Sequence, residues 1–259
     1  MAYKDILVYL DPTPSSEDRL RVAIGLAKAH AARLIAVDAS SDEAFLGLWG
    51  KRALQIEPTF SEAVKTAGLK AEFFGGADRQ GTRHPDYLHC VDLMISPRPE
   101  GDARELVRPF VPDQALVNSG VPMLVIPQDW KFGPLGEDIV IAWNASREAT
   151  RAVHDALPFL KKARKVTIFA FSSGPSGLRA SSESLAEHLM RHGVTAKVSD
   201  WTNTGDITAV EALFASLDTQ QSDLIVAGAF GHSRTFEGLF GGVSIDLLHQ
   251  PSLPVLMSH

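Results

Sequence analysis

The stretch Asp223–Ser244, DLIVAGAFGHSRTFEGLFGGVS, contains the strongest fold signal in this chain. It opens with the apolar run Leu224–Ala227, which has the length and composition of a buried β-strand. The run ends at Gly228, and Gly231 follows after two residues. Nine residues later, the pair Gly241-Gly242 begins an apolar segment that indicates a short helix. The stretch therefore predicts a strand, a loop punctuated by glycines and a helix.

A loop of this kind is one way for a protein to hold a phosphate group. Glycine lets the backbone approach a ligand closely, and the free N–H groups at a helix start attract an anion. The alternative interpretation is that the glycines only turn the chain. An isolated Gly-x-x-Gly pattern does not decide between these two interpretations.

The whole chain consists of two similar halves. Matching positions recur at offsets of 133, 131 and 132 residues: Asp5 with Asp138, Asp92 with Asp223, and Pro122 with Pro254. Each half alternates strand and helix patterns, which predicts a parallel sheet with helices on both faces. We therefore expect an α/β fold of two tandem, doubly wound, Rossmann-like parallel-sheet domains, related by an internal pseudo-two-fold repeat. The domains are residues 1–128 and 138–259, with a linker at 129–137.

The spacing Gly228-x2-Gly231-x9-Gly241 resembles the nucleotide loop of the universal stress protein family, which is written G-x2-G-x9-G-[S/T]. The last position of that pattern is Gly242 here, instead of Ser or Thr. The flanking segments also resemble the family, and the resemblance covers the whole chain. It implies two adenine nucleotide alpha hydrolase-like domains, the first of them degenerate. It further implies a stress-response protein that binds ATP or AMP in the second domain, with no metal beyond the Mg²⁺ that accompanies ATP.

The resemblance also implies which residues surround the nucleotide. Asn144 occupies the position of an acidic residue that contacts the nucleoside; its amide can donate and accept hydrogen bonds, or it can simply turn the chain. Phe171 matches the wall beside the base only loosely. His232 is a phosphate contact if protonated, and otherwise an exposed loop histidine. The expected phosphate-side positions are Gly228, Gly231, His232, Ser233, Gly241, Gly242, Val243 and Ser244.

The first half retains an acidic residue but lacks the glycine loop. Asp11 follows its first apolar strand, at the position that matches Asn144. The segment Ser96–Pro99 stands where the glycines would be needed. Proline has no backbone N–H to offer an anion and has a fixed φ. We therefore expect the first half to bind no nucleotide.

Two other functions remain open at this stage. The first is an interaction or regulatory module whose nucleotide site has decayed in both halves, which Gly242 and Asn144 favour. The second is a weak ATPase or phosphotransferase, against which the sequence shows no candidate general base beside the glycine loop. His188 and His192 have the i, i+4 spacing of a zinc pair, but the H-E-x-x-H pattern is absent, which favours a solvated surface.

Composition excludes several classes of protein. The 259-residue chain has a net charge of −6 and a pI near 5.8, without the basic surface that nucleic-acid binding requires. No apolar run approaches the roughly 20 residues that span a bilayer. Cys90 is the only cysteine, and the N-terminus has no signal-peptide pattern, so we expect a cytoplasmic protein that binds neither nucleic acid nor a membrane.

Each half ends in an apolar strand that would be an exposed sheet edge, Met123–Ile126 in the first half and Val255–Met257 in the second. The family resemblance implies that such edges pair across a two-fold axis. We therefore expect the two halves to pair with each other inside one chain. A further homodimer is possible, and the sequence does not decide it.

Overall fold

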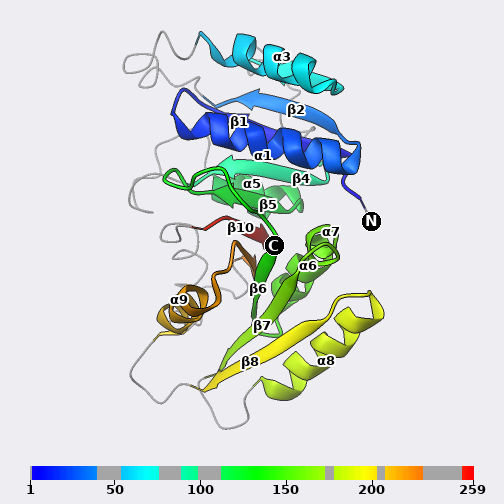
Figure 1. Cartoon of the computed structure of the whole chain (residues 1–259), viewed down its shortest axis with the longest axis vertical. Coiled ribbons are helices and arrows are strands. Elements are labelled where there is room, and N and C mark those ends of the chain that lie inside the picture. Colours follow the sequence, from blue (N-terminus) through cyan, green and yellow to red (C-terminus); the bar gives the residue numbers. More distant parts are fainter. Residues whose placement is uncertain are drawn as a thin grey trace. The chain divides into compact units, whose positions relative to one another are not determined.

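The computed structural model describes residues 2–39, 54–75, 89–98, 112–172, 178–202, 208–229 and 253–259 (Figure 1). The chain divides into two compact units, Met1–Phe132 and Gly133–His259. Within each unit, the described strand pairs are parallel, and helices connect the strands. The predicted α/β class, with two repeated doubly wound halves, is therefore confirmed.

The first unit has the strand order β3-β2-β1-β4-β5, and each described pair of neighbours in it is parallel. The strand β1 is central, so the chain moves outward to one side through β2 and β3, and then to the other side through β4 and β5. Its elements are β1 (Asp5–Leu10), α1 (Ser15–His30), β2 (Arg33–Asp38), α3 (Ile56–Ala67), β3 (Ala71–Phe74), β4 (Leu93–Pro97), α5 (Pro112–Ser119) and β5 (Met123–Ile126).

The core of the first unit lies along its central strands. Residues Ile6–Leu10 of β1 are at most 2% exposed, and Leu93–Ile95 of β4 are fully buried. Helices cover the faces of a parallel sheet, so its strands are continuous apolar runs without alternating polar residues. Helix α1 packs on β1, β2 and β4, and α3 lies beside α1. This arrangement explains why these strands are short apolar runs in the sequence.

The second unit repeats this order as β8-β7-β6-β9-β10, again parallel throughout its described pairs, with β6 in the centre. The repeat predicted from the offsets of about 132 residues is therefore a repeat of topology. Its elements are β6 (Asp138–Trp143), α6 (Arg147–Asp155), α7 (Leu157–Leu160), β7 (Lys165–Ser172), α8 (Arg179–Arg191), β8 (Ala196–Thr202), α9 (Ala209–Gln220), β9 (Leu224–Gly228) and β10 (Val255–Ser258).

The sequence predicts Ser15 or Ser16 as the N-cap of the first helix, and Ser146 as the N-cap of a helix from about Arg147 to Leu160. These two predictions have different outcomes. Ser146 caps α6 as expected, because its Oγ accepts a hydrogen bond from the N–H of Ala149 at 3.1 Å. The helix predicted from Arg147 to Leu160 is divided into α6 and α7, since Pro158 has no N–H to continue the first ladder. The prediction that Ser15 or Ser16 caps the first helix is wrong. Both serines lie inside α1, which follows Pro14 without a side-chain cap.

Within its own unit, β5 pairs with β4, and β10 pairs with β9. The expected pairing between them, and any homodimer, remain predictions. Among the helices that the structure describes, none is both long and apolar enough to cross a membrane.

Candidate functional site

The carboxyl ends of β6 and β9 lie side by side in the second unit. The two strands are parallel, with Ala142 opposite Ala227, so Asn144 and Gly228 stand at adjacent strand ends. The strand order reverses direction between β6 and β9. In doubly wound sheets, ligands bind at such a reversal, beyond the carboxyl ends of the strands. The topology thus brings together two residues that are 84 positions apart in the sequence.

Asn144 forms the turn between β6 and α6. Its Oδ1 accepts a hydrogen bond from the N–H of Ser146 at 3.1 Å, and Ser146 in turn caps the helix. Between them, Ala145 has a left-handed backbone with φ of 58°. Asn144 is half-buried, and its Nδ2 donates no hydrogen bond to any of the described residues. The side chain therefore shapes the loop through its oxygen, while its nitrogen remains a donor for a ligand.

Gly228 has a packing role that the sequence analysis did not assign. A Cβ at this position would lie 2.4 Å from the backbone N of Ala149 and 2.7 Å from the carbonyl carbon of Glu148. Both atoms belong to the first turn of α6, which cannot move aside as a flexible side chain would. Glycine is therefore required here so that the end of β9 can contact the start of α6. Gly228 still begins the predicted loop, but the packing alone excludes any residue with a Cβ at this position.

Phe171 lies near the carboxyl end of β7, on the other side of β6. The strand pairing places Trp143 of β6 opposite Ala170, one residue before Phe171. Its backbone position is thus consistent with the predicted wall of the site. Trp143 itself is buried, and its Nε1 donates to Oγ of Ser181 at 2.9 Å. Trp143 therefore belongs to the core of the second unit.

The rest of the predicted phosphate site lies outside the described residues. This part comprises Gly231, His232, Ser233, Gly241, Gly242, Val243 and Ser244. The role of these residues stays a prediction from the sequence.

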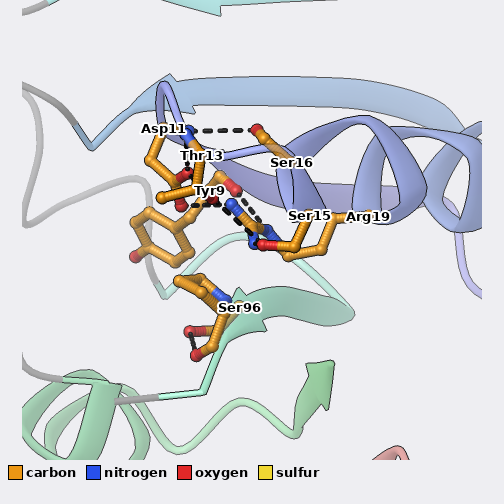
Figure 2. A network of polar contacts seen from close by, with 8 residues as sticks. Tyr9, Asp11, Thr13, Ser15, Ser16, Arg19 and Ser96 are labelled. Atoms are coloured by element: carbon orange, nitrogen blue, oxygen red, sulfur yellow. Dashed lines mark hydrogen bonds and ion pairs between the residues drawn. The ribbon is translucent and has the colours of Figure 1, made fainter. Parts of the chain in front are cut away.

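The matching strand end of the first unit has a buried ion pair (Figure 2). The Arg19 side chain is fully buried, and its Nη2 donates to Oδ2 of Asp11. The guanidinium also donates through Nε to the Tyr9 carbonyl at 3.1 Å and through Nη1 to Ser15 Oγ at 3.2 Å. Burial lowers the pKa of Arg19 from its ordinary value, while Asp11 acts in the opposite direction. The carboxylate at this strand end is therefore paired with a cation of the protein itself.

The second carboxylate oxygen of Asp11 is also engaged. Oδ1 accepts hydrogen bonds from the N–H of Thr13, at 2.8 Å, and from its hydroxyl. The N–H of Asp11 donates to Ser16 Oγ at 3.1 Å. The contact to residue i+2 is the same turn that Asn144 makes with Ser146. Both units therefore leave their central strand through one kind of turn, with a carboxylate in one unit and an amide in the other.

Arg19 is a site residue that the sequence analysis missed. At the repeat offset of 133, its counterpart in the second unit is Ala152, which is fully buried, just as Asn144 is the counterpart of Asp11. The first unit therefore has a charged residue at both positions, whereas the second unit has an uncharged residue at both. A signal was available: Arg19 precedes the buried Ala23 and Ala27 at intervals of four, which places it on the apolar face of its helix.

A cavity of about 220 Å³ adjoins Asp11 in the first unit. It lies between the end of β1, the first turn of α1 and the start of α3; its lining includes Asp11, Thr13, Gln55, Ile56 and Thr59. At the neighbouring end of β4, Ser96 Oγ donates to the Pro97 carbonyl at 2.9 Å. The first unit therefore has a hollow at its strand ends, but its carboxylate is already paired.

The fold defines a class of protein: an α/β chain of two doubly wound units, each with a reversal of strand order beside its central strand. No protein-family model and no curated protein matches the sequence. Among solved structures, the chain is similar to a universal stress protein from Archaeoglobus fulgidus, with 17% identity and a TM-score of 0.72, over 98% of this chain and 97% of the other. A protein of unknown function from Pseudomonas aeruginosa matches with 13% identity and a TM-score of 0.60, over 99% and 92%.

At these identities the similarity concerns the fold. Both matches extend over nearly the full length of this chain, so they include both units. The chain therefore has the universal stress protein fold along its whole length. The resemblance inferred from the glycine spacing is confirmed at that level.

Proposed function

We propose that this chain is a tandem universal stress protein whose second unit binds one adenine nucleotide, ATP or AMP, and whose first unit binds none. The observation that carries the proposal is the reversal of strand order between β6 and β9, which brings Asn144 beside the start of the glycine loop at Gly228. In this proposal, the glycine pattern of the sequence forms the phosphate-binding loop, and Asn144 at the end of the neighbouring strand contacts the nucleoside.

In this proposal, Asn144 donates through Nδ2 to an acceptor on the ribose or the base. Its Oδ1 is held by Ser146, which fixes the orientation of the amide. The loop that follows Gly228 surrounds the phosphates with backbone N–H groups and with the hydroxyls of Ser233 and Ser244. An uncharged amide in place of a carboxylate removes one negative charge from the neighbourhood of an anionic ligand. This loss favours nucleotides with more phosphates, since like charges repel.

The first unit is proposed to bind no nucleotide, for a physical reason. Asp11 is paired with the buried Arg19, so a nucleoside hydroxyl would have to replace a charged donor. Hydrogen bonds to charged groups are the stronger ones, and an unpaired buried arginine is costly. In addition, β4 ends at Pro97, which offers no N–H to a phosphate.

One observation favours the rival proposal of an interaction module without a nucleotide. The oxygen of Asn144 and the missing side chain of Gly228 both have intramolecular roles, so neither residue requires a ligand to explain it. The two proposals differ in whether the protein retains nucleotide during purification. A weak ATPase differs from both in releasing ADP over time.

The experiment is to denature the purified full chain by heat and to analyse the supernatant by ion-exchange chromatography. The nucleotide-binding proposal predicts released ATP, ADP or AMP in an amount close to that of the protein. If no nucleotide is released, and the refolded or untreated protein also fails to bind added ATP and AMP, the interaction module replaces it. Incubating the protein with ATP before the same separation tests for hydrolysis.

A further inference from the structure

Three histidines gather on one face of the second unit. His154 lies in the last turn of α6, and His188 lies in the last turn of α8, while His192 follows α8 directly. The Nε2 atoms of His154 and His188 are 3.3 Å apart, and their ring centroids are 5.4 Å apart. The rings of His188 and His192 are 4.7 Å apart and edge-on. The sequence indicated only the pair on α8; the third histidine, from another helix, is supplied by the fold.

The separation of the two Nε2 atoms is informative. The N–H···O hydrogen bonds of proteins span about 2.7–3.2 Å, so the 3.3 Å between these two nitrogens lies at the long end for a hydrogen bond. Two Zn–N bonds of about 2.0–2.1 Å at the tetrahedral angle separate their nitrogens by about 3.3–3.4 Å. The observed 3.3 Å is therefore the separation expected for two imidazoles that share a metal ion.

The electrostatic setting agrees with a cation at this point. Both His154 and His188 stand at the carboxyl ends of helices, where the helix dipole favours positive charge. Metal binding needs imidazole in its neutral form. Partial desolvation lowers the pKa of His188, and nearby His192, His154 and Arg191 lower it further. At neutral pH the ring therefore presents a lone pair. The guanidinium of Arg191 opposes a bound cation by like-charge repulsion.

We propose that His154 and His188 bind one divalent transition-metal ion of the zinc class between their Nε2 atoms. Imidazole ligands suit Zn²⁺, Cu²⁺ and Ni²⁺, whereas Mg²⁺ prefers oxygen. Within the described part of the chain, no group of three or more His, Cys, Asp or Glu side chains is arranged to hold a metal. The site thus has two protein ligands, with the remaining positions filled by water. Such a site is open and exchangeable, and it joins α6 to α8 independently of any nucleotide.

The test is a calorimetric titration of the metal-free full chain with Zn²⁺, in a buffer that does not chelate it, with Mg²⁺ as the comparison. The proposal predicts a Zn²⁺ site that Mg²⁺ neither fills nor blocks. His154→Ala and His188→Ala each lose it, whereas the matched control His192→Ala keeps it. Arg191→Gln tightens it, because a repelling charge is removed. All four positions are at least partly exposed, so the variants are expected to fold, and melting curves without metal check this.

Long-range ¹H–¹⁵N spectra of the histidine rings locate the bound ion directly. The proposal predicts that Zn²⁺ shifts the Nε2 resonances of His154 and His188 together, at one equivalent. Zn²⁺ binding that survives His154→Ala and is lost in His192→Ala would assign the ion to the i, i+4 pair on α8, and would overturn the proposal. Binding unchanged by all three histidine variants would overturn it as well.

Discussion

Arg19 donates from the buried face of α1 to the carboxylate of Asp11 at the end of β1, and the equivalent residues of the second unit are Ala152 and Asn144. The two units therefore differ in the residues at the carboxyl end of their central strand, although the fold around it is the same. In the first unit, this strand end has a buried ion pair between Arg19 and Asp11. A neutral amide and an alanine leave that of the second unit without an internal ion pair.

The ion pair is predicted to be important for the stability of the first unit. Arg19→Met leaves the Asp11 carboxylate, whose side chain is 8% exposed, without its cation. Breaking one partner of a buried pair costs about 3–5 kcal/mol. The double variant Arg19→Met with Asp11→Asn should recover much of this loss, because no charge is left unpaired. Urea unfolding of the three proteins measures the effect. A single variant as stable as the parent would show that the pair contributes nothing.

Gly228→Ala is predicted to destabilise the second unit, because the new Cβ would lie 2.4 Å from a backbone nitrogen of α6. Overpacking of this kind costs about 1–3 kcal/mol, or more where backbone must move. Gly25→Ala is the matched control: nothing lies within 4 Å of its added Cβ, on an exposed part of α1. That change should stabilise the protein by roughly 0.5–1 kcal/mol. Equal effects of the two substitutions on the unfolding midpoint would contradict the packing role of Gly228.

The stability of the second unit is predicted to fall below about pH 6.5 through His188. Partial desolvation, followed by His192, His154 and Arg191, lowers the pKa of His188 below its ordinary value of 6.5. Just below that pH, the unfolded chain binds more protons at this residue than the folded chain does. Stability rises with pH where the unfolded state binds more protons, so it is lost as the pH falls. The His188→Gln variant should lose less stability over the same pH range, because glutamine does not titrate there.

Calorimetric melting of both proteins, in the presence of a chelator, compares their pH profiles between neutral and mildly acidic pH. The difference between the two profiles is the readout, because other groups also titrate. Profiles that run parallel through the range below about pH 6.5 would show that His188 has no part in the effect.

Periodicity and turn residues were sufficient to predict much of the fold. The strand β5 was predicted residue for residue, and Ser146 was predicted as the cap of α6. These features depend on nearby residues, whose spacing the sequence displays. Pro158 also displays the break between α6 and α7, but the continuous apolar pattern around it outweighed that signal in the prediction.

The tertiary details of the candidate sites were not predictable in the same way. A charged side chain on a helix is usually exposed, so the burial of Arg19 against Asp11 was not expected from its residue type. The packing of Gly228 on α6 depends on a contact between segments about 80 residues apart. His154 and His188 are 34 residues apart on different helices, and no motif marks that spacing.

Gly242→Ser is predicted to tighten ATP binding more than AMP binding. Ser or Thr at this position of the family pattern donates a hydroxyl to a phosphate, and a hydrogen bond to a charged group contributes about 1.5–3 kcal/mol. This corresponds to about ten- to a hundredfold in affinity, since about 1.4 kcal/mol is tenfold. Competition titrations with both nucleotides measure the difference, and melting of the ligand-free variant checks for strain. An undamaged variant that binds ATP no more tightly would show that this loop does not hold phosphates.

The location of the nucleotide is tested most directly by calorimetric titration of the nucleotide-free full chain with ATP. Two variants accompany the parent: Asn144→Ala in the second unit, and Arg19→Met with Asp11→Asn in the first. The account predicts one ATP per chain, bound more weakly by Asn144→Ala and unchanged in the first-unit variant. Two ATP per chain, or a single site that is lost in the first-unit variant and retained in Asn144→Ala, would contradict it.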